Sequence, residues 1–144
     1  MLDTEFHYVL MRCFNKSNKL IVQRTAQLGL YPGQPKILEC LLEEDGQTPK
    51  NIGRRCVLDK STITSLLNKM EQQKLVFRQI QSADKRSVKI FLTDLGREKA
   101  AEVKKICQQV DDLALSRLSL TQQRKLTQFL HEVLSTFEEA SLHE

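Results

Sequence analysis

The chain has 144 residues, which is enough for one domain with a buried core and a second small subdomain. Its 40% apolar content excludes wholesale disorder, and it has no run of about 18 apolar residues, so we expect no membrane-spanning helix. The positive charge is concentrated in residues 50–105, which hold 14 basic and 6 acidic side chains, between two mildly acidic ends. This distribution is typical of a polyanion-binding module, although charge alone fits a solvated face equally well.

Two further features bear on the cellular compartment. The first residues, "MLDTEFHYVLM", carry acidic groups where a secretory signal would carry cations, which predicts a cytoplasmic protein. The cysteines form no C-x-x-C pair and lie within or next to helical patterns, which favours reduced thiols. They are Cys13, Cys40, Cys56 and Cys107.

Helical periodicity organises the first third of the chain. Apolar residues at helical spacing predict a first helix of more than five turns that starts at Phe6 and stops at Gly29. "YPGQP" breaks the chain, and a shorter helix around residues 37–42 ends in "EEDG". Thr48 is then a candidate N-cap, and Pro49 occupies the first position of a short third helix.

A fourth helix begins at the N-cap candidate Asp59 and has two distinct faces. Ile63, Leu66, Leu67 and Met70 form an apolar stripe. The opposite face carries Ser61, Thr64, Ser65, Asn68 and Gln72, with Lys69 on its flank. A merely solvated face would favour Glu and Lys pairs, so this hydrogen-bonding face resembles the second helix of a helix-turn-helix, which enters the DNA major groove. The alternative is an ordinary amphipathic helix pair.

A β-hairpin is predicted next, because residues 75–80 and 87–92 are β-prone and flank a polar loop. In that loop the cations Lys85 and Arg86 could contact phosphates or the neighbouring minor groove. Asp84 could hold the Arg86 guanidinium in a fixed position. Thr93 is expected to cap a fifth helix.

Two C-terminal helices are predicted from apolar stripes on either side of "LSLTQQ". They would leave an unpaired apolar face on a compact monomer, and the first helix of a partner subunit could bury it. Packing on the first helix of the same chain is the alternative, and both can contribute. The stripes are Val103, Ile106, Cys107, Val110, Leu113 and Ala114, followed by Leu126, Phe129, Leu130, Val133, Leu134 and Phe137.

The hairpin segment "DKRSVKIFLTDLG" matches the signature D-x-R, five residues, L-T-x-x-G of the MarR family of bacterial winged-helix transcription regulators. "GLYPGQPKILECL" and "DKSTITSLLNKMEQQKLV" are similar to the family's second-helix entry and recognition helix. The resemblance implies a mainly α fold with a small β-hairpin wing. It places a winged helix-turn-helix domain at residues 31–96 and a helical dimerisation region at residues 1–30 and 97–144. The implied function is transcriptional regulation, as a homodimeric repressor that binds a palindromic operator and responds to a small-molecule ligand.

Ten residues are candidate DNA contacts. On the recognition helix they are Lys60, Ser61, Thr62, Thr64, Ser65, Asn68 and Lys69, and on the wing they are Asp84, Lys85 and Arg86. The amide of Asn68 could pair with adenine, whereas the lysines would meet the backbone. Two positions depart from the family pattern. Ser65 stands where an arginine is frequent, which weakens the case for guanine recognition, and Lys74 stands where glycine is usual, so it must adopt a left-handed conformation or the helix must end differently.

The effector is open. Many members of the family bind small aromatic anions, and others sense oxidants through a cysteine of the first helix. Cys13 lies on that helix, but on its apolar stripe, where a buried structural thiol is the commoner case. The oxidant-sensing branch also has tyrosines placed to receive its cysteine, and this chain has only Tyr8 and Tyr31. Arg12 and Lys16 lie one turn apart and form either an anion site or a solvated pair.

Other functional classes find less support. His7, His131 and His143 lack metal-ligand spacing, and no Gly-rich phosphate loop or Ser-His-Asp set is present, so we expect no metal, no cofactor and no enzyme. A helical protein-interaction module would explain the amphipathic helices but not the basic hairpin. The expected partners are double-stranded DNA, a second copy of the chain and a small aromatic or anionic effector, with no membrane. Repressor versus activator, the operator and the regulated genes are open.

Overall fold

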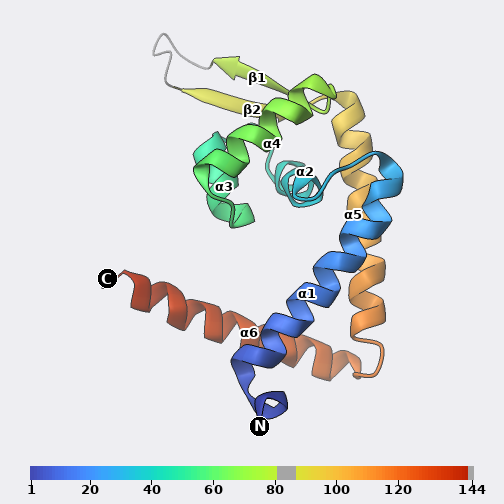
Figure 1. The fold of residues 1–144 in the computed structure, drawn as a ribbon, viewed down its shortest axis with the longest axis vertical. Helices are drawn as coiled ribbons and strands as arrows, with labels where there is room; N and C mark the ends of the chain where they lie inside the picture. Colours follow the sequence, from blue (N-terminus) through green and yellow to red (C-terminus); the bar gives the residue numbers. More distant parts are fainter. Residues whose placement is uncertain (81–86, 143–144) are drawn as a thin grey trace. The chain divides into compact units, whose positions relative to one another are not determined.

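The computed structural model describes residues 1–80 and 87–142 and divides the chain into two compact units, Met1–Val110 and Asp111–Glu144. The α-helices and strands of the described residues follow one another in the order α1, α2, α3, α4, β1, β2, α5 and α6, as labelled in Figure 1. The predicted fold class, mainly α with a small β-hairpin, is confirmed. Among the described residues no helix combines the length and the apolar character that crossing a bilayer requires.

Helix α1 (Phe6–Thr25) forms the start of the first unit and ends as predicted. A short 3-10 turn, Ala26–Leu28, continues it to Gly29, which has a φ of 79°. A residue in this left-handed conformation is a common helix terminator, and glycine adopts it without steric cost. The apolar side chains in the first half of α1 are exposed, from 40% for Leu10 to 63% for Phe14, whereas those of its second half are half-buried.

Helices α2 (Gln34–Glu43), α3 (Pro49–Cys56) and α4 (Lys60–Gln72) surround the core of this unit. The predicted caps are present: Thr48 Oγ1 accepts from Asn51 N at 3.1 Å, and Asp59 Oδ1 accepts from Thr62 N at 2.7 Å. Each cap satisfies one of the N–H groups that a helix start leaves without a partner. The fully buried side chains of these helices include Ile37, Leu38, Leu41, Ile52, Leu67 and Met70.

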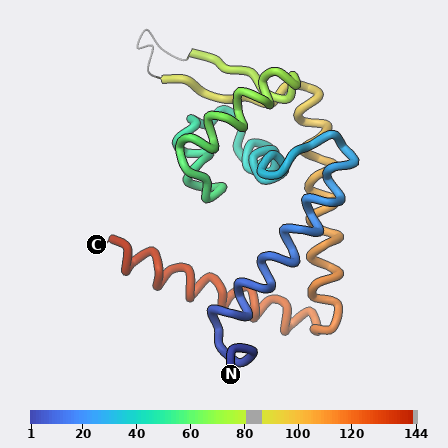
Figure 2. The backbone as a smooth tube through the Cα atoms, in the orientation of Figure 1, coloured from blue at the N-terminus to red at the C-terminus, as the bar shows by residue number. Residues whose placement is uncertain are grey.

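Strands β1 (Val76–Ile80) and β2 (Val88–Leu92) form the predicted antiparallel hairpin. Figure 2 follows the chain from α4 through this hairpin into α5. The segment before α3 pairs with β2, because Gly46 N donates to Ile90 O at 3.0 Å and Ile90 N donates to Gln47 O at 2.8 Å. These bonds, with the buried side chain of Ile90, attach the base of the wing to the helix-turn-helix.

Helix α5 (Asp94–Ala114) is joined to the end of α4 through the motif that contains Thr93 and Gly96. Thr93 Oγ1 accepts from Gly96 N at 2.9 Å, which confirms the predicted cap, and donates to Lys74 O at 2.6 Å. Lys74 itself has a φ of 61°, so the chain adopts the left-handed conformation that the departure from glycine required. The L-T-x-x-G motif is therefore a packing junction between the helix-turn-helix and α5.

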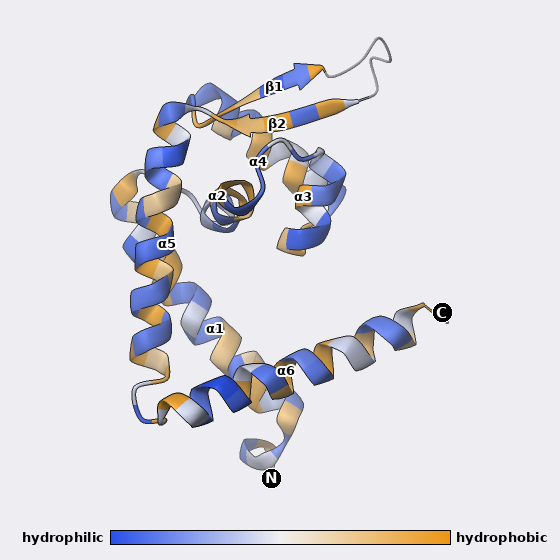
Figure 3. Ribbon diagram, turned by 180° about the vertical axis from the view of Figure 1, so that it is seen from behind, coloured by the Kyte–Doolittle hydropathy of each residue, from blue (hydrophilic) through white to orange (hydrophobic). Residues whose placement is uncertain are grey.

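The second unit consists mainly of α6 (Leu120–Ser141), which begins with a capping box. Ser119 Oγ accepts from Gln122 N at 3.2 Å, and Gln122 Oε1 accepts from Ser119 N at 2.9 Å. None of the described residues of α6 is buried, and its apolar side chains, such as Phe129 at 65%, are exposed. Figure 3 shows hydrophobic and hydrophilic residues alternating along this helix. The division into residues 31–96 and 1–30 with 97–144 stays a prediction.

Candidate DNA-binding surface

The outer face of α4 is a continuous polar surface on the first unit. Five of the seven predicted contacts on this helix line a shallow depression: Lys60, Ser61, Thr64, Ser65 and Asn68. Lys69 is also exposed and Thr62 is half-buried, whereas the apolar residues Ile63, Leu67 and Met70 face the core. The predicted faces of the helix are therefore correctly divided, and the role of the exposed face in DNA binding stays a prediction.

Two hydroxyl groups on the exposed face of α4 donate to acceptors at the start of the helix. Ser61 Oγ donates to Asp59 Oδ1 at 2.9 Å, and Thr64 Oγ1 donates to Lys60 O at 2.8 Å. A hydroxyl that already donates can still accept, so these groups present acceptors to a ligand. Hydrogen bonds from Thr62, followed by that from Ser61, lower the pKa of Asp59, which keeps the capping carboxylate ionised.

Arg78 on β1 is a functional candidate that our sequence reasoning missed. Its Nη2 donates to Asn68 Oδ1 at 2.5 Å, and its Nε donates to Glu71 Oε2 at 2.9 Å. The sequence of α4 has no arginine on its exposed face, but strand β1 brings Arg78 to this face. The strand alternation could have indicated this, since Arg78 shares a face of β1 with the buried Val76.

The far end of α4 is held by contacts with the segment before α2. Lys69 Nζ lies 3.7 Å from the centroid of the Tyr31 ring, a cation–π contact. The buried Gln34 accepts from Tyr31 N at 3.1 Å and donates to Gln73 Oε1 at 2.7 Å. The Lys69 ammonium group thus lies at a defined place on the flank of the helix, where we predicted a contact with the DNA backbone.

Of the wing candidates, Asp84, Lys85 and Arg86 lie outside the described residues, so their predicted contacts stay predictions. The described strands of the hairpin carry the stacked pair Phe77 and Phe91, with ring centroids 5.6 Å apart. This pair lies on the face of the hairpin opposite to Val76 and Ile90.

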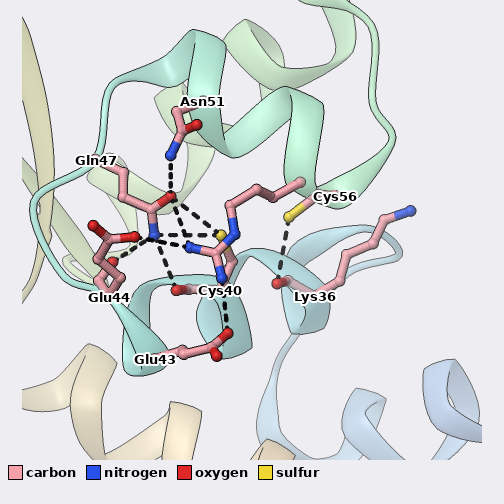
Figure 4. A network of polar contacts seen from close by, with 8 residues as sticks. Lys36, Cys40, Glu43, Glu44, Gln47, Asn51 and Cys56 are labelled. Carbon is pink, nitrogen blue, oxygen red and sulfur yellow. Dashed lines mark hydrogen bonds and ion pairs between the residues drawn. The ribbon is translucent and has the colours of Figure 1, made fainter. Parts of the chain in front are cut away.

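A polar network between α2 and α3 supports the helix-turn-helix (Figure 4). Gln47, which is 4% exposed, donates to Cys40 O at 3.1 Å and Glu44 O at 2.5 Å and accepts from Asn51 Nδ2 at 2.6 Å. Arg55 adds ion pairs to Glu43 at 2.8 Å and Glu44 at 3.1 Å. A satisfied buried amide favours one arrangement of the two helices, because an arrangement that broke all of its bonds would leave a buried polar group without a partner.

Next to this network lies an open cleft of about 970 Å³. It contains three basic side chains, Lys36, Arg55 and Lys104, and two carboxylates, Glu39 and Glu43. The remaining lining is Phe14, Asn18, Cys40, Leu42, Cys56 and Val57. The lining residues of the cleft come from α1, α2, α3, α5 and the turn after α3.

The four cysteines are in the thiol form and have different environments. Cys40 and Cys56 are buried, and burial, followed by the neighbouring Cys40, raises the pKa of Cys56 to about 12. Cys13 is exposed, so the buried structural thiol that we considered commoner for this position is not what the chain shows. The reason is that the apolar stripe of α1 has little cover there: the neighbouring Phe14 is 63% exposed.

The other candidate ligand groups are dispersed. The Arg12 guanidinium lies 5.8 Å from the centroid of the Tyr8 ring, and neither Arg12 nor Lys16 is part of the lining of the cleft. Within residues 1–80 and 87–142 no group of three or more His, Cys, Asp or Glu side chains is arranged to hold a metal ion.

Comparison with known proteins places these features in a family. The sequence profile described as the MarR family matches residues 30–88. The organic hydroperoxide resistance transcriptional regulator of Bacillus subtilis (strain 168) is 34% identical over 138 residues, which cover 94% of this chain and 90% of that protein. The HTH-type transcriptional regulator TtmR of Methylorubrum extorquens is 46% identical over 67 residues, covering 46% of this chain but only 34% of TtmR.

Solved structures show the same fold at low identity. A MarR-family transcriptional regulator from Silicibacter pomeroyi has a TM-score of 0.84 at 21% identity and covers 94% of this chain and 92% of its own. The S. aureus MepR–DNA complex has a TM-score of 0.82 at 22% identity, and the match covers 92% of this chain and 98% of the MepR chain. The Mycobacterium tuberculosis MarR-family protein Rv2887 in complex with salicylic acid has a TM-score of 0.73 at 23% identity, and the match covers 90% of this chain and 96% of the Rv2887 chain. Together with the full-length similarity to the Bacillus regulator, this shows that the chain belongs to the MarR family of transcriptional regulators.

Proposed function

We propose that the protein is a homodimeric repressor that binds a palindromic operator through α4 and the wing. The observation that carries the proposal is the exposed polar face of α4, which a capped, tightly packed helix-turn-helix presents outward. A recognition helix that reads base edges needs short hydrogen-bonding side chains on such a face. MepR, which shares the fold, has been solved with DNA.

Dimerisation is supported by the apolar side chains exposed on α1 and α6. Those of α6 include Leu126, Phe129, Leu130, Leu134 and Phe137, each between 39% and 65% exposed. A monomer rarely leaves so many large apolar groups in water, and a two-fold interface would bury them. Light scattering at micromolar concentration should therefore give twice the chain mass, whereas a stable particle of 16.6 kDa would exclude the dimer.

DNA binding is tested by comparing a selected duplex with a random duplex at one fixed salt concentration. Lys69→Ala should weaken binding to both duplexes about equally, because an ammonium group contacts the backbone. Asn68→Ala should cost on the order of 1–3 kcal/mol at the selected duplex only. If Asn68→Ala weakens binding to both duplexes equally, or if neither substitution changes the affinity, α4 is not the recognition helix. Raised transcription from a reporter after deletion would establish repression rather than activation.

The effector that we propose is a small aromatic anion in the cleft behind the helix-turn-helix. Arg55 is paired with Glu43 and Glu44, so Lys36 and Lys104 supply the charge for a ligand carboxylate, with Phe14 as an apolar wall. Salicylic acid bound to Rv2887 is an example of this chemical class in the same fold. Salicylate should lower the operator affinity of the wild type but not that of Lys36→Ala. If salicylate lowers the affinity of both proteins equally, the cleft is not part of the mechanism.

A second candidate is control by oxidation at Cys13. It is favoured by the exposure of this thiol on α1 in the single chain and by the similarity to a regulator of organic hydroperoxide resistance. Oxidants act on exposed thiols in preference to buried ones. An organic hydroperoxide should then release the wild type from DNA but leave Cys13→Ser bound, and equal behaviour of the two proteins would reject this candidate.

A further inference from the structure

Arg78 connects the wing to the recognition helix at the position where base contacts are expected. Its guanidinium is bound at two points of α4, by Asn68 Oδ1 at 2.5 Å and by Glu71 Oε2 at 2.9 Å. Asn68 and Glu71 lie three residues apart and therefore on one side of the helix. A planar group held at two points has a defined orientation, so Arg78 is fixed on α4 rather than extended into solvent.

The contact decides which edge of the Asn68 amide can face a ligand. A free asparagine amide can rotate and present either its carbonyl oxygen or its NH₂ group. The guanidinium of Arg78 carries only donors, so it is compatible only with the carbonyl oxygen. The Nδ2 donors of Asn68 are thereby left for the exposed face of α4, beside the remaining N–H groups of Arg78.

The ion pair with Glu71 argues against a simple phosphate contact by Arg78. Glu71 is 44% exposed and Arg78 is 36% exposed at their side chains, and each neutralises the other. A residue whose task is to attract phosphates does so best with its charge uncompensated. The arrangement of Arg78 therefore favours orientation of a neighbour over attraction of the backbone.

Resting on the DNA-binding function proposed above, we propose that Arg78 is a specificity-determining residue that positions Asn68 as a donor. The Arg78–Asn68 pair presents N–H groups side by side, and guanine is the base whose major-groove edge offers two acceptors, N7 and O6. Adenine requires an acceptor for its N6 amino group, and one of the two lone pairs of Asn68 Oδ1 already accepts from Arg78, whose positive charge also repels a second donor brought to this oxygen. The pair thus selects guanine, whereas an unrestrained Asn68 would select adenine.

The test measures base preference with a library of duplexes randomised at the bound positions. The wild type should prefer guanine at one position of each half-site, and Asn68→Ala should lose this preference. Arg78→Ala should reduce the ratio of guanine to adenine at that position by about tenfold or more, because one good base contact discriminates on that scale. Arg78→Lys is the matched control: it keeps the charge but lacks the fork, so it should also fail to select guanine.

Three outcomes would overturn the inference. An unchanged base preference in Arg78→Ala, with selective binding by the wild type, would refute it while leaving the DNA-binding function intact. If Arg78→Ala binds all duplexes more weakly by the same factor, with a salt slope lower by one unit, and Arg78→Lys recovers the full affinity, Arg78 is a phosphate contact. A wild type that binds no duplex would overturn the proposed function together with this inference. Melting curves by circular dichroism should coincide for all variants, because an exposed pair contributes little to stability.

Discussion

Replacing Gly96 by alanine tests the junction between α5 and the end of α4. A Cβ atom added to Gly96 would lie 1.9 Å from Leu75 O, and Cβ atoms are essentially never found within 3.0 Å of a non-bonded heavy atom, so the gap must widen by about 1.1 Å. The obstacle is backbone, which cannot rotate aside as a side chain can. The start of α5 would have to move away from the turn that contains Lys74 and Leu75.

The expected change in the free energy of unfolding combines two destabilising effects and one stabilising effect. Overpacking of this kind costs about 1–3 kcal/mol, occasionally more. The movement would also weaken the bonds of Thr93 Oγ1 with Gly96 N and Lys74 O, at about 1 kcal/mol each. Alanine gains about 1 kcal/mol over glycine in a helix. We therefore expect Gly96→Ala to lower the free energy of unfolding by about 2–4 kcal/mol.

The assay is urea unfolding followed by circular dichroism at one fixed protein concentration, since a dimer would couple stability to concentration. Gly53→Ala in α3 is the matched control, because its Cβ would lie 3.1 Å from Leu58 O, a contact that small shifts can relieve. This control should stay within about 1 kcal/mol of the wild type. A Gly96→Ala variant that is about 1 kcal/mol more stable than the wild type, as helix propensity alone predicts, would refute the close approach of α5.

Three further predictions concern the cap of α4, the wing and a buried thiol. Asp59→Ala should melt at a lower temperature than the wild type, whereas Asp59→Asn, which keeps an acceptor for Thr62 N, should not. Because the pKa of Asp59 is lowered, its contribution is present above pH 3.8 and is lost as the pH falls through the lower folded-state value; an acid titration that is identical in Asp59→Asn would contradict this. Arg86→Ala should weaken binding to every duplex and lower the salt slope by roughly one unit, and unchanged affinity with intact folding would remove the wing from the mechanism. The raised pKa of Cys56 means that the protonated thiol stabilises the fold fully below pH 9.0 and that this contribution is lost as the pH rises to about 12. Alkaline unfolding should therefore set in more steeply in the wild type than in Cys56→Ala, and parallel curves would show that the thiol does not titrate there.

The local features of this protein could be predicted from its sequence. Thr48 and Asp59 cap their helices through N–H groups three residues away, so the relevant partners are visible in a window of four residues. The two faces of α4 follow in the same way from helical periodicity. The L-T-x-x-G motif also predicted the start of α5, because Thr93 and Gly96 are again three residues apart.

The tertiary structure decided the contacts between elements. Arg78 reaches Asn68 only because the turn at Lys74 and the register of the hairpin direct its side chain toward α4, and no local pattern encodes that distance. The exposure of Cys13 likewise depends on what covers α1, since an apolar stripe specifies that a helix will be buried but not by which surface. Helical spacing, caps and turns arise from interactions within a few residues, whereas the partners of a side chain across elements are set by packing of the whole core.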